Sequence, residues 1–333
     1  MSRGPVVIEV TRGPIVESRH EGIAAVVRAD GTVVESWGDI DAAILPRSAN
    51  KPIQAMAFVE SGAVERFGLG DEHVALSCAS HSGEPRHVET VRAWLAKIGL
   101  SEADLECGTH APRLQSSIEA LARANTLPTA AFNNCSGKHS GFLTTAVHYG
   151  EPTKGYITYD HPVQRRLRET MSELCGLDAN AFPHGTDGCG IPTLATPLKS
   201  LAQAMASMAD PSRLSSKRAD AAIRIRKAMN AEPFMVAGTG RFCTRINEAA
   251  PGVIQVKTGA EGVFCGMLPT LGLGVALKVW DGAGRAAEVA MAALLDHLGV
   301  LPAGQREEVL HPQIKNVVGL LVGEMRPAKS WLG

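Results

Sequence analysis

Hydrophobic and polar positions alternate near both ends of the chain, with the period of two that is typical of half-buried strands. Asp30-Gly31, between two apolar runs, favours a tight hairpin turn. The pattern therefore predicts an antiparallel sheet to which both ends of the chain contribute. The expected strands cover residues 6–16, 23–37, 253–257, 263–267, 273–280 and 316–322.

Between these two groups of strands, apolar residues recur at helical spacing. Two helices are delimited by a proline in the first turn and a glycine after the last residue, Pro85 with Gly99 and Pro162 with Gly176. The short apolar run 74–78 is expected to be a strand. Further helices are expected after Ser48, to about residue 59, and over residues 198–208, 219–229 and 285–298.

These patterns predict a mixed α/β fold of the α+β type, in which an antiparallel sheet is flanked by helices and joined to a helical lobe. The chain has 333 residues, more than the roughly 250–300 at which single cores stop growing. We therefore expect one catalytic unit of two lobes. The sheet lobe is expected from about residues 1–60 and 235–333, and the helical lobe from about 61–234.

Composition narrows the class of protein. Hydrophobic residues make up 45% of the chain and charged residues 20%, as in ordinary globular enzymes. A net charge of -1 gives no electrostatic reason to expect binding to nucleic acid or to an anionic membrane. Because the longest apolar runs are too short to span a bilayer and the first residues lack a signal-peptide core, we expect a cytoplasmic protein.

The chain contains a single S-x-x-K pattern, formed by Ser48 and Lys51. On a helical turn these side chains face the same way, so the hydroxyl is within reach of the amine. A lysine can take a serine's proton only if burial or a nearby cation keeps it neutral. A later K-T-G, residues 257–259, completes the pair of motifs typical of class A β-lactamases and penicillin-binding proteins. The alternative role of Ser48 is a helix N-cap.

Three polar segments are candidate site loops. Residues 79–83 contain Ser80, which is either a second catalytic hydroxyl or part of a turn that caps the next helix. Residues 133–141 and 184–192 are punctuated by glycines, which let the backbone approach a ligand closely.

The chain has seven cysteines, an odd number that argues against a disulfide framework and favours free thiols or metal ligands. Cys135 and Cys189 lie in the two glycine-rich loops, each near other donors, and could bind zinc together. Two unligated thiols are the alternative. By chemistry alone His139 would precede Lys138 as a third ligand, because a lysine must lose its proton to bind a metal.

Five motifs follow one another as P-R-S-A-N-K-P (46–52), S-C-A-S-H-S-G-E (77–84), N-C-S-G-K-H (134–139), D-G-C-G (187–190) and K-T-G-A-E-G (257–262). Together they resemble the Rhizobium-type (class 3) L-asparaginases, and the resemblance covers essentially the whole chain. It implies a serine-dependent amidohydrolase, related in fold to β-lactamases and glutaminases and assembled as a homodimer.

The resemblance also assigns residues. It implies two serine–lysine pairs, Ser48 with Lys51 and Ser80 with Lys257. The zinc ion that it implies would be bound by Cys135, Lys138 and Cys189, which replaces the chemical preference for His139.

The hypothesis that follows is hydrolysis of L-asparagine by acyl transfer: a serine attacks the side-chain amide, ammonia leaves, and water hydrolyses the ester. Ser48 is the preferred nucleophile because its spacing from Lys51 is fixed by the sequence, and Ser80 is the alternative. Three residues are predicted to bind substrate, Arg47 at the α-carboxylate, Asp187 at the α-ammonium, and His139. The competing functions are a β-lactamase or penicillin-binding-type acyl hydrolase, a glutaminase, and a non-catalytic zinc-binding protein.

Overall fold

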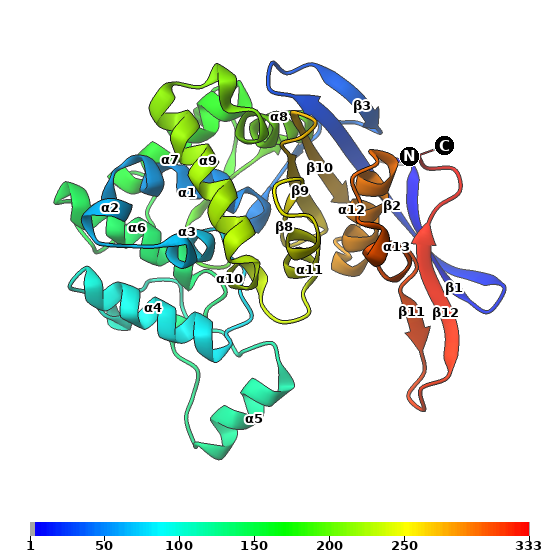
Figure 1. The fold of residues 1–333 in the computed structure, drawn as a ribbon, viewed down its shortest axis with the longest axis horizontal. Coiled ribbons are helices and arrows are strands. Elements are labelled where there is room, and N and C mark those ends of the chain that lie inside the picture. The colour runs from blue at the N-terminus through cyan, green and yellow to red at the C-terminus, as the bar shows by residue number, and fades with distance from the viewer. Residues whose placement is uncertain (1–3, 333) are drawn as a thin grey trace.

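The computed structural model describes residues 4–332, in which an eight-stranded antiparallel sheet lies beside a group of helices (Figure 1). The strand order is β11-β12-β1-β2-β10-β9-β8, and β3 also pairs with β2. The strands of this sheet are β1 Val6–Arg12, β2 Ile15–Arg28, β3 Val33–Trp37, β8 Gln255–Thr258, β9 Val263–Leu268, β10 Leu273–Val279, β11 Gln313–Lys315 and β12 Leu321–Pro327. Two small ribbons pair β4 Ala43–Ile44 with β7 Thr196–Pro197, and β5 His184–Thr186 with β6 Pro192–Leu194.

Most of the sheet follows the predicted pattern. The hairpin at Asp30-Gly31 is confirmed, since the Gly31 N–H donates to the Arg28 carbonyl at 3.0 Å and β2 runs antiparallel to β3. The predicted strand 6–16 is instead divided by a turn at Gly13, whose φ of 54° suits glycine. The predicted strand 316–322 is wrong in its first part, because residues 316–320 form the turn between β11 and β12.

The helical part of the chain contains most of the predicted helices. The helices are α1 Lys51–Glu60, α2 Ala63–Arg66, α3 Asp71–Ser77, α4 Pro85–Lys97, α5 Gln115–Arg123, α6 Ser136–Tyr149, α7 Pro162–Cys175, α8 Leu198–Ala209, α9 Ser216–Ala231, α10 Pro233–Ala237, α11 Phe242–Ala249, α12 Gly284–His297 and α13 Ala303–Leu310. The proline starts and glycine stops of α4 and α7 are confirmed.

The expected strand 74–78 is wrong, since this run lies mostly in α3. Two acidic residues, Asp71 and Glu72, occupy the first turn of α3, where negative charge is favourable. The Nδ1 atom of His73 accepts the Gly70 N–H at 3.1 Å and closes that end of the helix. A short apolar run does not distinguish a buried strand from one buried helical turn.

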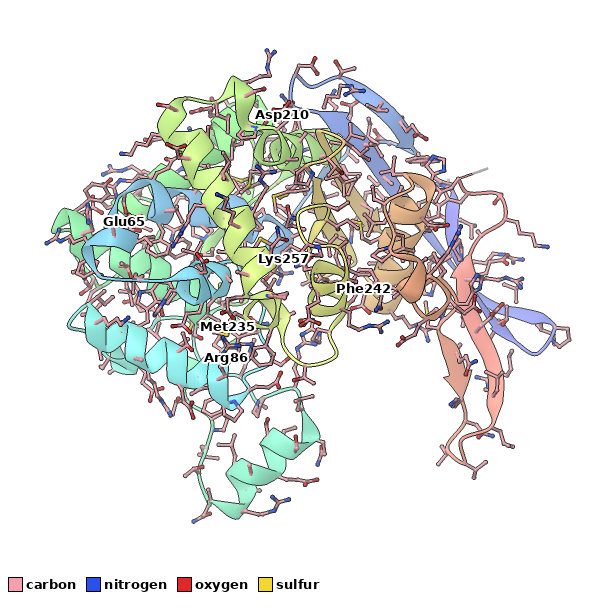
Figure 2. All side chains as sticks on the ribbon, in the orientation of Figure 1. Glu65, Arg86, Asp210, Met235, Phe242 and Lys257 are labelled. Atoms are coloured by element: carbon pink, nitrogen blue, oxygen red, sulfur yellow. The ribbon has the colours of Figure 1, made fainter. Side chains whose placement is uncertain are left out.

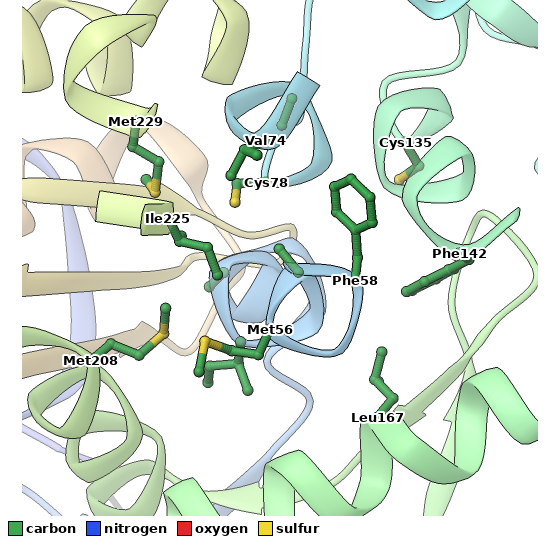
Figure 3. Close-up of a cluster of buried hydrophobic side chains, with 14 of the residues drawn as sticks. Met56, Phe58, Val74, Cys78, Cys135, Phe142, Leu167, Met208, Ile225 and Met229 are labelled. Carbon is green, nitrogen blue, oxygen red and sulfur yellow. The ribbon is translucent and has the colours of Figure 1, made fainter. Parts of the chain in front are cut away.

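Hydrophobic side chains pack on both faces of the sheet. In β2, Ala25 and Val27 belong to the core shared with the helical part, whereas Ala24 and Val26 belong to the core under α11 and α12. The first core surrounds α1, and Figure 3 shows Met56 and Phe58 among its members. The sheet is therefore a central layer, and the helices that carry the site residues stand on one side of it.

The α+β fold class, an antiparallel sheet flanked by helices and joined to a helical part, is confirmed by these elements. The exact division of the chain into two lobes stays a prediction. Within residues 4–332, no helix is both long enough and apolar enough to cross a membrane.

Candidate functional site

Two lysines from distant parts of the chain converge on one serine. Ser80 follows the end of α3, and its Oγ lies 2.8 Å from Lys257 Nζ and 3.2 Å from Lys51 Nζ. The three side chains are buried, with 6%, 2% and 0% of the surfaces of Ser80, Lys257 and Lys51 exposed. The Ser80 N–H donates to the Val236 carbonyl at 3.0 Å, which fixes the backbone there. Figure 2 shows Lys257 where the sheet meets the helices.

The two lysines have different surroundings. Burial, with the charge of Lys51 acting in the same direction, lowers the pKa of Lys257 to about 7. Lys51 Nζ is surrounded by acceptors: the Ala79 carbonyl, the Asn134 carbonyl at 3.4 Å and Cys135 Sγ at 3.1 Å. A neutral Lys257 can therefore accept the Ser80 proton while a charged Lys51 stays hydrogen-bonded beside it.

Ser48 lies on a 3-10 turn, Arg47–Asn50, that leads into α1. Arg47 has a φ of 51°, in the left-handed region, and the turn holds Ser48 half-buried. Within residues 4–332 the Ser48 hydroxyl has no hydrogen-bond partner, and Lys51, the predicted partner of Ser48, instead extends to Ser80. Pro52 occupies the first turn of α1, where its missing N–H costs nothing.

The glycine of the K-T-G motif brings the Ser48 turn and Lys257 together. A Cβ added at Gly259 would lie 2.8 Å from the Pro46 carbonyl oxygen and 3.0 Å from the Ala49 nitrogen. The first distance is shorter than real Cβ contacts and the second is unusually tight, so glycine lets the chain after β8 lie against this turn where a side chain would force the backbone to shift. Residues 46–51 and 257–259 are therefore neighbours, as the order of the motifs predicted.

A second close approach positions the thiol loop. Gly137 lies in the first turn of α6, and a Cβ there would be 2.3 Å from the Leu76 carbonyl oxygen at the end of α3. This contact holds the start of α6, with Cys135 and Lys138, beside the segment that carries Ser80. Sequence inspection identified the glycine but not the helix that it contacts.

The thiols form one buried cluster. Lys138 Nζ lies 3.0 Å from Cys189 Sγ, Lys51 Nζ lies 3.1 Å from Cys135 Sγ, and the two thiols are close enough to shift each other's pKa. The neighbouring Cys189 thiol, with the charges of Lys138 and Lys51, holds the pKa of Cys135 well below its usual value, whereas Cys135 and burial raise the pKa of Cys189. Burial works against the charge on Lys138, but the thiolates and Asp187 outweigh it and raise the pKa of Lys138. Negative charge at the sulfur atoms and positive charge on Lys138 therefore stabilise each other.

This donor set fits a zinc ion, because two sulfur atoms and one amine from separate loops already lie in mutual contact. Within the described residues, no group of three or more His, Cys, Asp or Glu side chains is placed to hold a metal. The third donor of the cluster is a lysine, which falls outside those residue types. Zinc binding would require Lys138 to lose its proton.

The predicted substrate-binding residues lie in two places. Arg47 Nε donates to Asp187 Oδ1 at 2.6 Å, so each of these side chains fixes the position of the other. The second carboxylate oxygen of Asp187, Oδ2, lies 3.7 Å from Cys189 Sγ. His139 is fully buried on α6, and its Nδ1 lies 2.7 Å from the Tyr156 hydroxyl.

Sequence inspection missed a clamp on the loop before α11. The Glu84 carboxylate accepts the Thr239 N–H at 2.8 Å and the Thr239 hydroxyl at 2.7 Å. Gly238 has a φ of 111° and approaches Glu84 too closely for any side chain. The clamp ties the segment after Ser80 to the chain that precedes β8, and the only signal for it was the Gly238-Thr239-Gly240 sequence.

Comparison with known proteins gives one family and several distant structures. The chain is similar to a β-lactamase from Mycobacterium bovis, with 16% identity over 83% of this chain and 94% of that one and a TM-score of 0.41. It is similar to the protein Mglu, crystallised in its tris and glutamate form, with 15% identity over 90% of this chain and 64% of that one and a TM-score of 0.48. No curated protein matches the chain.

The L-asparaginase II family matches residues 8–327, which is nearly the whole chain and includes all five motifs. The resemblance drawn from those motifs is confirmed by this match. The chain therefore belongs to the L-asparaginase II family, an amidohydrolase family whose members act on asparagine.

Proposed function

We propose that the protein hydrolyses L-asparagine to L-aspartate and ammonia, with Ser80 as the nucleophile and Lys257 as its base. The observation that supports this most directly is the 2.8 Å contact between Lys257 Nζ and Ser80 Oγ. The sequence favoured Ser48, because of its spacing from Lys51. The hydrogen bonds favour Ser80, since both lysines lie within reach of its hydroxyl.

The reaction has two halves. Ser80 Oγ attacks the side-chain amide carbon as its proton moves to neutral Lys257, and the Lys257 ammonium then protonates the departing ammonia, leaving an aspartyl ester on Ser80. Water, deprotonated by Lys257, attacks the ester, and the proton returns to Ser80 Oγ as aspartate leaves. The Ser80 N–H is already donated to the Val236 carbonyl, so the Lys51 ammonium, 3.2 Å from Ser80 Oγ, is the group that we assign to stabilising the developing negative charge.

Arg47, Asp187 and His139 are the proposed binding groups for the amino-acid part of the substrate. Asp187 suits the α-ammonium, and Arg47 both orients Asp187 and can offer its remaining guanidinium N–H groups to the α-carboxylate. A zinc ion, if held by Cys135, Lys138 and Cys189, would supply a Lewis acid or fix the two loops. Homodimer assembly, implied by the family resemblance, is also a proposal, and light scattering of the eluted protein measures it.

The test is ammonia release from L-asparagine by wild type, Ser80→Ala, Ser48→Ala and Lys257→Met, each with and without added zinc. We expect Ser80→Ala to lose on the order of 10³-fold or more of kcat, and Lys257→Met to lose about 10²–10⁴-fold, the usual contribution of a general base. Ser116→Ala is the matched control, because Ser116 is exposed on α5.

Equal activity of wild type and Ser80→Ala would refute the mechanism. Parallel assays with glutamine and with a chromogenic cephalosporin distinguish the competing functions. Faster turnover of glutamine would make the protein a glutaminase, and turnover of the cephalosporin alone would make it a β-lactamase.

A further inference from the structure

A buried histidine beside the thiol cluster has one ring nitrogen with a partner and one without. His139 Nδ1 lies 2.7 Å from the Tyr156 hydroxyl. His139 Nε2 is buried and, among the residues that the structure describes, has no hydrogen-bond partner. Buried polar atoms are nearly always paired, so an unpaired ring nitrogen next to the thiol cluster is a candidate contact for a ligand atom.

The Tyr156 hydroxyl determines where the imidazole proton lies. This oxygen accepts the Glu106 N–H at 2.9 Å. The hydroxyl's own proton must therefore be donated to a different acceptor. Tyr156 is fully buried, and within residues 4–332 the other partner of its hydroxyl is His139 Nδ1. Tyr156 therefore donates to Nδ1, and the proton of a neutral His139 ring is on Nε2. A proton on Nδ1 would leave the buried tyrosine proton without an acceptor.

Tyr156 itself is held at three points. The Glu106 N–H fixes its hydroxyl, and the Glu106 carboxylate accepts the N–H of the preceding residue, Gly155, at 2.9 Å. Its carbonyl accepts the side-chain amide of Gln164 at 2.9 Å. The tyrosine and histidine rings meet edge to face, with centroids 5.4 Å apart and an angle of 76°. These contacts fix the position of the Tyr156 hydroxyl. Its hydrogen bond with Nδ1 then fixes the orientation of the His139 ring.

His139 is also placed near the reacting groups. It follows Lys138 on α6, and the charges of both Lys138 and Lys51 act on its ring. Lys51 is the residue that contacts Ser80 Oγ. An N–H donor in this position, with no acceptor among residues 4–332, suits an oxygen of the bound substrate.

We propose that Tyr156 is a positioning residue that holds His139 in the Nε2–H tautomer, so that Nε2 donates a hydrogen bond to an oxygen of the substrate. The role of the hydrogen bond rests on the proposed function. The tautomer does not, because it follows from the contacts of Tyr156 alone. No atom of Tyr156 needs to touch the substrate.

The first experiment locates the proton in the wild-type protein. Long-range proton–nitrogen correlation spectra of protein carrying nitrogen-15 histidine distinguish a protonated Nε2 from a protonated Nδ1. The signal of His139 is assigned by its loss in His139→Gln. We expect the proton on Nε2 and a hydrogen-bonded Nδ1. A proton on Nδ1 would overturn the proposal whether or not the protein hydrolyses asparagine.

The second experiment tests the role in the reaction by a double-mutant cycle with Tyr156→Phe and His139→Ala. Tyr156→Phe should lower kcat/KM for asparagine about tenfold, the effect expected of one hydrogen bond, and should cause no further loss when His139 is already alanine. Additive losses would show that Tyr156 does not act through His139. Tyr159→Phe is the matched control, because its hydroxyl lies against Asn180 at 3.4 Å.

A conservative pair separates positioning from packing. Glutamine can place an amide N–H near the position of Nε2, whereas asparagine reaches only as far as Nδ1, so His139→Gln should retain more activity than His139→Asn. The reverse order would contradict the proposal. If wild type releases no ammonia from asparagine, the proposed function fails, and the spectra still decide the tautomer.

Discussion

At the scale of single residues, the site contains two buried lysines whose amines have different surroundings. Lys257 is buried, its amine contacts Ser80 Oγ and the Thr258 carbonyl, and its pKa is lowered to about 7. Lys51 is buried among two carbonyl oxygens and a thiol. The sequence identified both residues as catalytic candidates, but spacing along the chain could not tell which serine Lys51 would contact. That choice depends on where α3 ends relative to α1, which only the fold decides.

The lowered pKa of Lys257 gives a pH dependence. Below pH 7 the amine is protonated and cannot accept the Ser80 proton, so kcat/KM for asparagine should fall by about tenfold per pH unit on the acid side. Above about pH 7 the rate should level off. The measurement is a pH–rate profile, with Lys257→Arg as comparison because a guanidinium stays charged throughout. If kcat/KM does not fall toward low pH anywhere between about pH 9 and pH 6, Lys257 is not the base.

At the scale of elements, helices with a proline start and a glycine stop were predictable, because the residues that begin and end such a helix lie at its two ends in the sequence. The end of α3 was not, because residues 74–78 are equally apolar in a strand or a helix. Two glycines of the site motifs act between elements, Gly137 between α6 and α3 and Gly259 between β8 and the Ser48 turn. Their role could not be inferred from the sequence, since the contacting backbone lies far away in the chain.

Gly259→Ala tests whether that contact holds the site together. The new Cβ would overlap the Pro46 carbonyl oxygen, so the chain after β8 must move and take Lys257 away from Ser80. We expect kcat to fall by more than tenfold and the free energy of unfolding to fall by about 1–3 kcal/mol, as for overpacked sites. Chemical denaturation and ammonia release measure the two effects.

Gly304→Ala is the matched control, because a Cβ at Gly304 in α13 would contact nothing within 4 Å. Alanine there should leave activity unchanged and raise stability by roughly 0.5–1 kcal/mol, the usual gain for glycine in a helix. If both variants behave alike, the close approach at Gly259 has no role in positioning Lys257.

At the scale of the whole molecule, the chain leaves the sheet after β3, builds the helical part, and returns at β8 (Figure 1). This path brings Lys51, Ser80, Cys135, Cys189 and Lys257 to the boundary between the sheet and the helices. The five motifs together allowed the family to be identified from the sequence, because their order along the chain follows the path of the chain through the fold. Their contacts could not be predicted in detail, because each pair is joined through packing rather than through the chain.

The central claim is that the two lysines activate Ser80, and the most direct measurement is to locate the covalent intermediate. Wild-type protein is quenched in acid during turnover of asparagine, digested, and examined by mass spectrometry for an added aspartyl group. We predict that the aspartyl ester is found on the peptide that contains Ser80 and is absent in Ser80→Ala. An ester on Ser48, with the Ser80 peptide unmodified, would contradict the mechanism.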